Sequence, residues 1–384
     1  MEKVISKEKC CGCSACYNIC PKSAITMQED INGFHYPIIN EEKCINCHLC
    51  QKICPILNKT KKQLDYSERL AYACYNKNLP DRLNSSSGGV FALLAKNIIK
   101  RNGLVIGAQF NEDFLVEHTI VTKEDELEKL YGSKYVESNI NKIYTEIKSY
   151  LEDGKTVFFA GTPCEIYGLK NYLKRDYDNL YTQDIICHGV PSKKVWRKYL
   201  NYISKNEKIK KINFRNKKYG WNNFSMSIDT IRKKYNASHY DDPYMQFFLS
   251  NICLRQSCYD CQFKKGQIAS DITLGDFWGI DKFDEAMNDN KGTSLLILNS
   301  DKGKLLFNEI KNDIVLKKIN LEEVVPYNSA LEKSVELNDK RSDFLNDLDS
   351  LSFDELFTKY GVRKSKLKMR FETLKKEIKR RIKK

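Results

Sequence analysis

The chain has 384 residues, of which 41% are hydrophobic, and a formal charge of +14 at pH 7. This length allows two or three domains with hydrophobic cores of their own. Because no apolar run reaches the roughly eighteen residues of a membrane span, we expect a cytoplasmic protein. Fifteen cysteines in a reducing compartment indicate metal or redox chemistry rather than disulfide bonds.

The positive charge is concentrated at the C-terminus. Residues 361–384 hold twelve Lys or Arg against Glu372 and Glu377, a net of +10, which leaves +4 for the rest of the chain. Apolar residues recur there at helical spacing, namely Leu367, Phe371, Leu374, Ile378 and Ile382. The pattern predicts a basic amphipathic helix that contacts an anionic membrane surface or a partner, or that packs on its own domain. No zinc-finger, RNA-binding or helix-turn-helix pattern accompanies the charge, so nucleic acid is not expected as a partner.

In chain order, the first feature is a cysteine pattern that occurs twice. The two copies are Cys10, Cys13, Cys16 and Cys20 before Pro21, and Cys44, Cys47, Cys50 and Cys54 before Pro55. Three thiolates at this spacing can surround one 4Fe-4S cluster, while the fourth cysteine ligates the other cluster. The sequence therefore predicts a two-cluster ferredoxin domain over residues 1–60, in which Cys54 completes the first set and Cys20 the second. Cys11 lies outside the repeat and is predicted not to be a ligand.

Two other interpretations of these cysteines fit less well. A zinc site would use four thiolates per ion, usually in two separated C-x2-C pairs, which explains neither the third cysteine nor the proline after each fourth one. Disulfide bonds would require an oxidising compartment, and the N-terminus does not resemble a secretory signal.

After a polar linker near residues 59–70, apolar runs alternate with helical patterns. The predicted strands are 71–75, 104–110, 116–121, 156–160 and 181–187, and the predicted helices are 87–101, 123–131, 139–151 and 164–173. This alternation favours an α/β or α+β core around a mixed sheet. We expect the core to have two parts, 70–155 and 156–330, followed by a basic helical tail over 331–384.

Three loops at predicted helix starts could bind an anion. The standard dinucleotide and P-loop fingerprints are missing. Glycine and free N–H groups at a helix start can nevertheless hold phosphate, and such loops occur at 85–89, 161–164 and 188–192. Each of them also fits an ordinary helix cap.

A third group of cysteines, Cys253, Cys258 and Cys261, indicates a further metal site. Cys187 and Cys164 are the candidates for its fourth ligand, and we favour Cys187. Cys164 would then be a free thiol at a helix N-terminus, where the helix dipole stabilises a reactive thiolate, or an inert packed residue. His188 is a candidate proton donor, although a histidine at this position fits a structural role as well.

Five motifs resemble the coenzyme F-420 hydrogenase/dehydrogenase beta-subunit family. They are Ser87-Gly88-Gly89-Val90-Phe91, Gly132-Ser133-Lys134-Tyr135-Val136, Gly161-Thr162-Pro163-Cys164, the six residues from Cys187 to Ser192, and the ten from Ser270 to Gly279. The resemblance extends from about Tyr72 to Lys317 and excludes the tail. Glu165 departs from it, because members often carry Gln there, and this puts the polar contacts of that loop in doubt.

The resemblance implies a flavin-binding core in which FAD takes electrons from 4Fe-4S clusters and passes them to an organic acceptor. It implies that Ser87, Gly88, Gly89, Ser133, Lys134, Gly161, Thr162 and Pro163 line the flavin, that Lys291 and Gly292 reach its phosphates, and that Cys253, Cys258 and Cys261 hold a third cluster. Cys164, His188 and Lys134 are the candidate catalytic residues.

The partners are then a ferredoxin or another electron donor and a small-molecule acceptor. The acceptor is a deazaflavin such as F-420 or, in a bacterium, a small molecule or glycan precursor of surface-polysaccharide metabolism. The alternative is a non-catalytic subunit that carries electrons to a separate catalytic partner.

Overall fold

The computed structural model describes residues 4–58, 65–267 and 270–361. The predicted amphipathic helix of the tail and part of the predicted linker lie outside these residues. Within the described ranges, no helix is long and apolar enough to cross a membrane.

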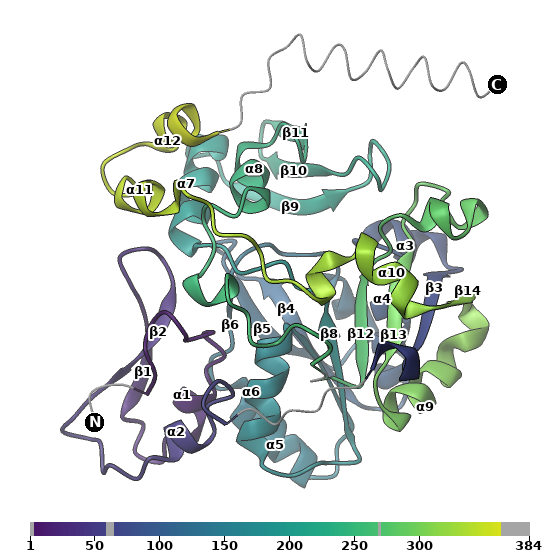
Figure 1. Ribbon diagram of the computed structural model, residues 1–384, viewed down its shortest axis with the longest axis horizontal. Coiled ribbons are helices and arrows are strands. Elements are labelled where there is room, and N and C mark those ends of the chain that lie inside the picture. The colour runs from purple at the N-terminus through teal and green to yellow at the C-terminus, as the bar shows by residue number, and fades with distance from the viewer. Residues whose placement is uncertain (1–3, 59–64, 268–269, 362–384) are drawn as a thin grey trace.

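The N-terminal domain is small and packs against one side of the core (Figure 1). It contains the helices α1 (Ala15–Ile19) and α2 (Leu49–Lys52) and an antiparallel hairpin of β1 (Ile25–Glu29) and β2 (His35–Ile39). Both helices begin at a residue with left-handed backbone, Ser14 with φ 59° and His48 with φ 59°. The two cysteine motifs therefore fold in the same way, each as a tight loop that leads into a short helix.

The core is built on a nine-stranded mixed sheet, in the order β14-β3-β13-β12-β8-β7-β4-β5-β6. The strands are β3 (Leu70–Asn76), β4 (Leu104–Phe110), β5 (Val116–Val121), β6 (Ser138–Asn139), β7 (Val157–Gly161), β8 (Leu180–Ile185), β12 (Ile272–Asp276), β13 (Ser294–Leu298) and β14 (Ile314–Ile319). The four central strands β12, β8, β7 and β4 are parallel, whereas β13, β3 and β14 on one side pair antiparallel.

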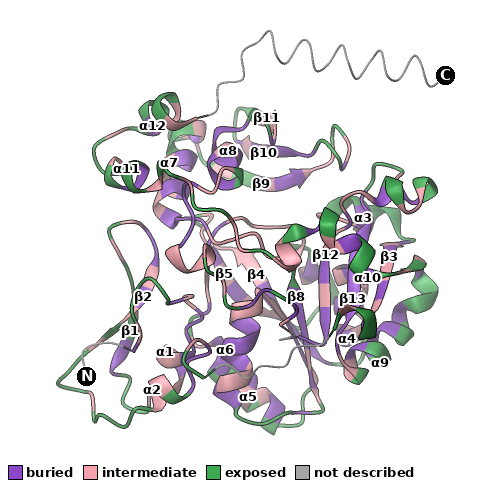
Figure 2. Cartoon of the chain, viewed as in Figure 1, coloured by how far each residue is buried: buried purple, intermediate pink, exposed green. Residues whose placement is uncertain are grey.

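Helices cover both faces of this sheet because the central strands are apolar on both sides. Leu104 and Ile106 pack with α5 (Ile143–Glu152) and α6 (Pro163–Leu173), while Val105 between them packs with α4 (Val90–Lys100) and α9 (Asp301–Ile310). Successive side chains of a strand point to opposite faces, so one apolar run serves two cores. Figure 2 shows these strands as largely buried, with intermediate segments. The short helices α3 (Leu79–Asn84) and α10 (Leu321–Val324) lie at the β3–β14 side.

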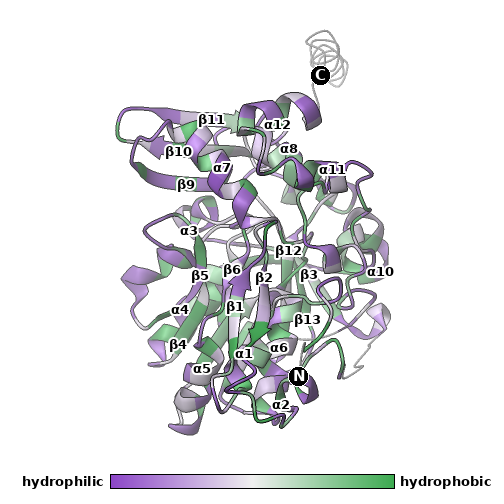
Figure 3. Ribbon diagram, turned by 90° about the vertical axis from the view of Figure 1, so that its left-hand side faces the viewer, coloured by the Kyte–Doolittle hydropathy of each residue, from purple (hydrophilic) through white to green (hydrophobic). Residues whose placement is uncertain are grey.

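A second layer lies beyond one end of the large sheet (Figures 1 and 3). It consists of a three-stranded antiparallel sheet of β9 (Ile209–Asn216), β10 (Ser225–Thr230) and β11 (Lys234–Ser238), with helices α7 (Lys193–Ser204), α8 (Pro243–Leu249), α11 (Arg341–Asn346) and α12 (Phe353–Tyr360). Trp196, Phe214 and Tyr244 form the centre of its apolar core. The segment 331–361, which we expected to belong to a helical tail, thus packs as α11 and α12 on this layer.

The predicted mixed α/β class is confirmed, and β4 and β5 have the predicted bounds. Three local differences are found, and two of them have an evident physical cause. Residues 124–130 form a 3-10 helix rather than an α-helix. Helix α5 begins at Ile143 rather than Asn139, because Ser138 and Asn139 pair with Val116 and Glu117 as a sheet strand. Helix α4 begins at Val90, because Gly89 before it has a left-handed backbone with φ 80°.

Candidate functional site

The two N-terminal motifs surround two separate hollows. One hollow is lined by Cys10, Cys13, Cys16 and Cys54 together with Cys11, which lies outside the repeat, and the other by Cys20, Cys44, Cys47 and Cys50. Each motif therefore contributes three cysteines to its own hollow and the fourth to the other. This is the arrangement that the spacing predicts for two clusters with exchanged fourth ligands.

The backbone of the loops explains why three thiols face one hollow. Gly12 (φ 75°) and Asn46 (φ 53°) are left-handed at the second position after the first cysteine of each motif, and Ser14 and His48 are left-handed at the fourth. These residues bend each loop twice within five positions. The donor set also fits a cluster, because the backbone N–H of Ala24 already donates to Cys20 Sγ at 3.3 Å, and such bonds stabilise a thiolate ligand.

The two hollows differ in exposure. Cys10, Cys13 and Cys54 are buried in the first, whereas Cys47 in the second is exposed. Burial raises the pKa of the Cys10 and Cys54 thiols. Among the described residues, no three His, Cys, Asp or Glu side chains come together in a way that would hold a single metal ion.

Four cysteine thiols lie near one another in the core, and we call them the third set; they include Cys187, Cys258 and Cys261 of the predicted ligands together with Cys164. Burial raises the pKa of the Cys187 thiol, and the neighbouring charges of Cys164, Cys258 and Cys261 add to the effect. Cys258 in turn is affected by Cys261 and Cys164. These four thiols come from the end of β8, the start of α6 and the segment after α8.

Cys253, which we expected in this set, lies elsewhere. Its side chain is fully buried in the apolar core beneath α8, among Tyr244, Phe247 and Phe248. The side-chain charge that acts on it is that of Arg341 rather than that of another cysteine. Cys253 therefore lies in a different core from Cys164 and Cys261, and the ligand set of a third cluster stays a prediction.

Cys11 connects the first hollow with the third set. Its thiol hydrogen-bonds with those of Cys13 and Cys164. Helix α6 also approaches this loop closely, because a Cβ atom on Gly168 would lie 3.1 Å from Cys13 Sγ. The three cysteine sets are thus arranged in sequence from the exposed second hollow, through the first, to the core.

Three of the loops expected to hold a cofactor lie together. Ser133 N–H donates to Ser86 Oγ at 2.6 Å, Ser87 Oγ donates to Thr293 O at 2.9 Å, and Gly88 N–H donates to Ser294 Oγ at 2.9 Å. These bonds join the segments 86–89, 133–134 and 291–294.

Lys217, which sequence reasoning missed, holds two of these segments together. Its ammonium group donates to the carbonyl oxygens of Arg82, Ser87 and Lys291, each at 2.7 Å. Gly292 adjoins this contact with φ 107°, and a Cβ atom there would lie 2.5 Å from Ser87 O. No local sequence motif marks Lys217, because its partners are backbone atoms of distant loops.

Lys134 is a cation whose hydrogen-bond partners are carbonyl oxygens. Its Nζ donates to Tyr131 O at 3.0 Å and to Gly132 O at 3.3 Å, and no ion pair of this lysine occurs in the described part of the chain. Burial lowers the pKa of Lys134 to about 7. The space beside Gly132 is open, because a Cβ atom there would meet nothing within 4 Å. An uncompensated ammonium group beside open space fits an anionic ligand such as a flavin.

His118 lies between the Gly161-Thr162-Pro163 loop and Lys134 and is near both. His118 Nε2 contacts Ala160 O at 3.1 Å, and the charge of Lys134 contributes to lowering the pKa of His118, of which burial is the main cause. Glu165, where family members often carry Gln, forms a capping box with Thr162 and so stabilises the start of α6. His188 does not join this group of residues. It contacts Asn251 Oδ1 at 2.8 Å and packs on Phe248, which is a structural environment.

Comparisons with known proteins match two parts of the chain. Residues 154–324 match the family model for the C-terminal part of the coenzyme F420 hydrogenase/dehydrogenase beta subunit, and residues 9–57 match the 4Fe-4S dicluster domain. The chain is 24% identical over 329 residues to the coenzyme F420-dependent sulfite reductase of Methanocaldococcus jannaschii, an alignment that covers 84% of this chain and 49% of that protein. A further 42% identity over 36 residues, 9% of this chain, links it to 47% of an uncharacterized ferredoxin of the same organism.

The chain spans about half the length of the curated relatives it matches. Among solved structures, a chain of the F420-reducing NiFe hydrogenase complex from Methanosarcina barkeri overlays on 78% of this chain and over 94% of its own length, with a TM-score of 0.47 and 13% identity. By these matches, residues 154–324 are similar to the C-terminal part of the coenzyme F420 hydrogenase/dehydrogenase beta subunit, and residues 9–57 are similar to the 4Fe-4S dicluster domain.

Proposed function

We propose that the chain is an iron-sulfur flavoprotein that exchanges electrons between a protein partner and a small organic acceptor. The observation that carries the proposal is the sequence of three cysteine sets, which begins at the exposed Cys47 and ends in the core at Cys164, Cys187, Cys258 and Cys261. A protein that only carried electrons as a two-cluster ferredoxin would need only the first two sets. The third set extends the path into the domain whose family includes F420-linked enzymes.

The residues that would hold each group follow from the geometry. Cys10, Cys13, Cys16 and Cys54 would hold one 4Fe-4S cluster, Cys20, Cys44, Cys47 and Cys50 a second, and Cys164, Cys187, Cys258 and Cys261 a third. The segments 86–89, 133–134 and 291–294 would hold FAD. Bound there, the flavin would supply the exchange between single electrons and a hydride.

The protein's own contribution at the flavin site is charge and shape. Lys134 would place an ammonium group beside the bound anion, and Lys217 would keep the loops of Ser87 and Lys291 at a fixed separation. The Gly88 N–H is already used by Ser294, so this glycine serves loop packing rather than direct phosphate binding. The acceptor is proposed only as a small organic molecule, of which an F420-like deazaflavin is one example.

The test is anaerobic purification of the chain with iron, acid-labile sulfide and flavin measured per protein. About twelve irons and one flavin are expected, since three 4Fe-4S sites each take four irons. About eight irons without flavin would leave a two-cluster electron carrier and contradict the proposal. That second outcome would favour a subunit that passes electrons to a separate catalytic partner.

A further inference from the structure

Arg255 is among the largest fully buried side chains of the molecule, with 1% of its surface exposed. It directly precedes the short 3-10 helix Gln256–Cys258, and its carbonyl oxygen accepts from Cys258 N–H at 3.0 Å. Its guanidinium group crosses to the N-terminal domain, where Nη1 donates to Cys10 O at 3.4 Å and Nη2 donates to His35 O at 3.0 Å. One side chain thus contacts the loop of the first cysteine set and belongs to the segment of the third.

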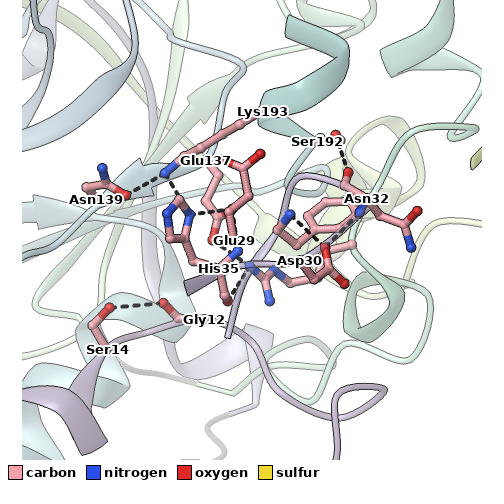
Figure 4. Close-up of polar contacts among 12 residues, drawn as sticks. Gly12, Ser14, Glu29, Asp30, Asn32, His35, Glu137, Asn139, Ser192 and Lys193 are labelled. Atoms are coloured by element: carbon pink, nitrogen blue, oxygen red, sulfur yellow. Dashed lines mark hydrogen bonds and ion pairs between the residues drawn. The ribbon is translucent and has the colours of Figure 1, made fainter. Parts of the chain in front are cut away.

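Glu137 compensates this charge from the core side. Arg255 Nη2 lies 2.5 Å from Glu137 Oε1, and Glu137 is 6% exposed. Burial acts to raise the pKa of Glu137, but the charge of Arg255 and the hydrogen bond from His35 lower it to about 2. Figure 4 shows how His35 lies between Glu137 and Lys193, and Lys193 contacts His35 Nδ1 at 3.0 Å. The pair is therefore a fixed, ionised and almost completely buried feature of the domain junction.

The guanidinium group lies against the first cysteine loop. A Cβ atom on Gly12 would lie 2.9 Å from Arg255 Nη2 and 3.0 Å from its Cζ. The charges of Cys10 and Cys258 both act on Arg255, so it is close to a ligand of each set. Its Nε–H has no acceptor among the described residues. A buried cation with one unused donor is therefore placed between two cysteine sets.

We propose that the Arg255–Glu137 pair sets the reduction potentials of the clusters held by the first and third cysteine sets. This inference rests on the proposed function, because it requires both sets to carry 4Fe-4S clusters. Reduction adds one negative charge to a cluster, so a nearby cation stabilises the reduced state and raises the potential, while a nearby carboxylate lowers it. In a desolvated junction these effects are weakly screened by solvent and salt. Arg255 and Glu137 are positioning residues that act on the clusters through their charge.

The experiment is a redox titration of the full, anaerobically purified chain, followed by electron paramagnetic resonance. Arg255→Met should lower the midpoint potentials of the first and third clusters, and Glu137→Gln should raise them. Arg255→Lys keeps the charge and should leave both potentials close to those of the unsubstituted protein. The cluster of Cys20, Cys44, Cys47 and Cys50 should shift less than the other two in every variant. Repeating the titrations in a Cys187→Ser background, which removes a ligand of the third set, assigns the signals.

A matched control comes from the Arg197–Glu29 ion pair. It joins the N-terminal domain to α7 of the second layer, and its side chains are 40% and 26% exposed. Arg197→Gln and Glu29→Gln should leave all midpoint potentials unchanged. If Arg255→Met does not fold, the midpoint potentials of Glu137→Gln and Arg255→Lys still test the inference. They should rise in the first variant and stay unchanged in the second.

Shifts of the same sign in Arg255→Met and Glu137→Gln would indicate a loosened junction and overturn the inference. An equal shift at all three clusters, or none, would overturn it as well. A failure of the proposed function is recognised separately, because the unsubstituted protein would then lack the expected cluster signals.

Discussion

The N-terminal cysteine sets and the third set use the same kind of ligand but are assembled in different ways. In the N-terminal domain, each hollow takes three thiols from one loop of seven residues, and left-handed residues at equivalent positions bend both loops alike. In the core, the four thiols come from three separate segments: Cys164 follows β7, Cys187 follows the parallel neighbour β8, and Cys258 and Cys261 follow α8. Spacing along the chain therefore predicts the members of a set when one loop supplies most of them. It says little when segments far apart in the sequence supply them.

The largest expected effect distinguishes Cys164 from Cys253 as the fourth ligand of the third cluster. Cys164→Ser should lose about four irons per chain while the two N-terminal clusters stay, because three thiolates hold a cluster poorly. Iron and sulfide analysis of the anaerobically purified variant measures this loss. The matched control is Cys253→Ala, which should keep its iron and change only the packing beneath α8. Iron loss in Cys253→Ala and not in Cys164→Ser would restore the assignment made from spacing.

The next effect concerns the contact between α6 of the core and the first cysteine loop of the N-terminal domain. Gly168→Leu places a side chain on α6 where a Cβ atom alone would meet Cys13 Cβ at 3.0 Å and Tyr144 Oη at 3.2 Å. Overpacking of this kind costs about 1–3 kcal/mol, so the melting temperature should fall and electron transfer between the first and third clusters should slow. Differential scanning calorimetry and freeze-quench kinetics measure the two changes. Gly154→Leu, at an exposed turn with nothing near its Cβ, provides the control for an added side chain, although its φ of 76° adds local strain.

A smaller effect is expected at the loops assigned to the flavin. Gly292→Ala combines a positive φ of 107° with a Cβ position 2.5 Å from Ser87 O, which should cost about 1–3 kcal/mol and separate the loops that Lys217 joins. Flavin absorbance per chain should decrease, whereas the iron content should not. Full retention of flavin at unchanged stability would show that these loops do not form its site.

The smallest effect is a dependence on pH at Lys134. Burial lowers the pKa of this lysine from 10.5 to about 7, so the unfolded chain binds more protons than the folded one between these values. The stability penalty is therefore complete below about pH 7 and disappears as the pH rises toward 10.5. Because Lys134 is only partly buried by surface area, Lys134→Met should stabilise the flavin-free protein by no more than about 1 kcal/mol at pH 7. Urea unfolding at pH 7 and pH 9 measures the change.

Lys134→Arg is the control, since arginine stays charged and should show no gain at either pH. A difference between Lys134→Met and the unsubstituted protein that is the same at both pH values would contradict the lowered pKa. Flavin binding should weaken in Lys134→Met, because the ammonium group that would face the bound anion is removed.

Prediction from sequence succeeded where neighbours in the chain are neighbours in space. The strands 104–110 and 116–121 follow from short β-branched runs, and the helix predicted over 164–173 follows from its Thr-Pro cap. The role of Lys217 could not be predicted, because its three acceptors are carbonyl groups at 82, 87 and 291. Arg255 was missed for a related reason, since its contacts with His35 and Glu137 join three distant segments.

The sequence by itself determined the two N-terminal cysteine motifs, the mixed α/β class and the bounds of the strands 104–110 and 116–121, because each depends on spacing or periodicity within a few residues. Only the tertiary structure places Cys164 near Cys187, Cys258 and Cys261 and puts Cys253 in a separate core. It also decided that Cys11 lies between the first and third sets, and that a buried Arg255–Glu137 pair occupies the junction. The physical reason is that burial and proximity between separate segments arise from the packing of the sheet, its helices and the N-terminal domain, which no local pattern encodes.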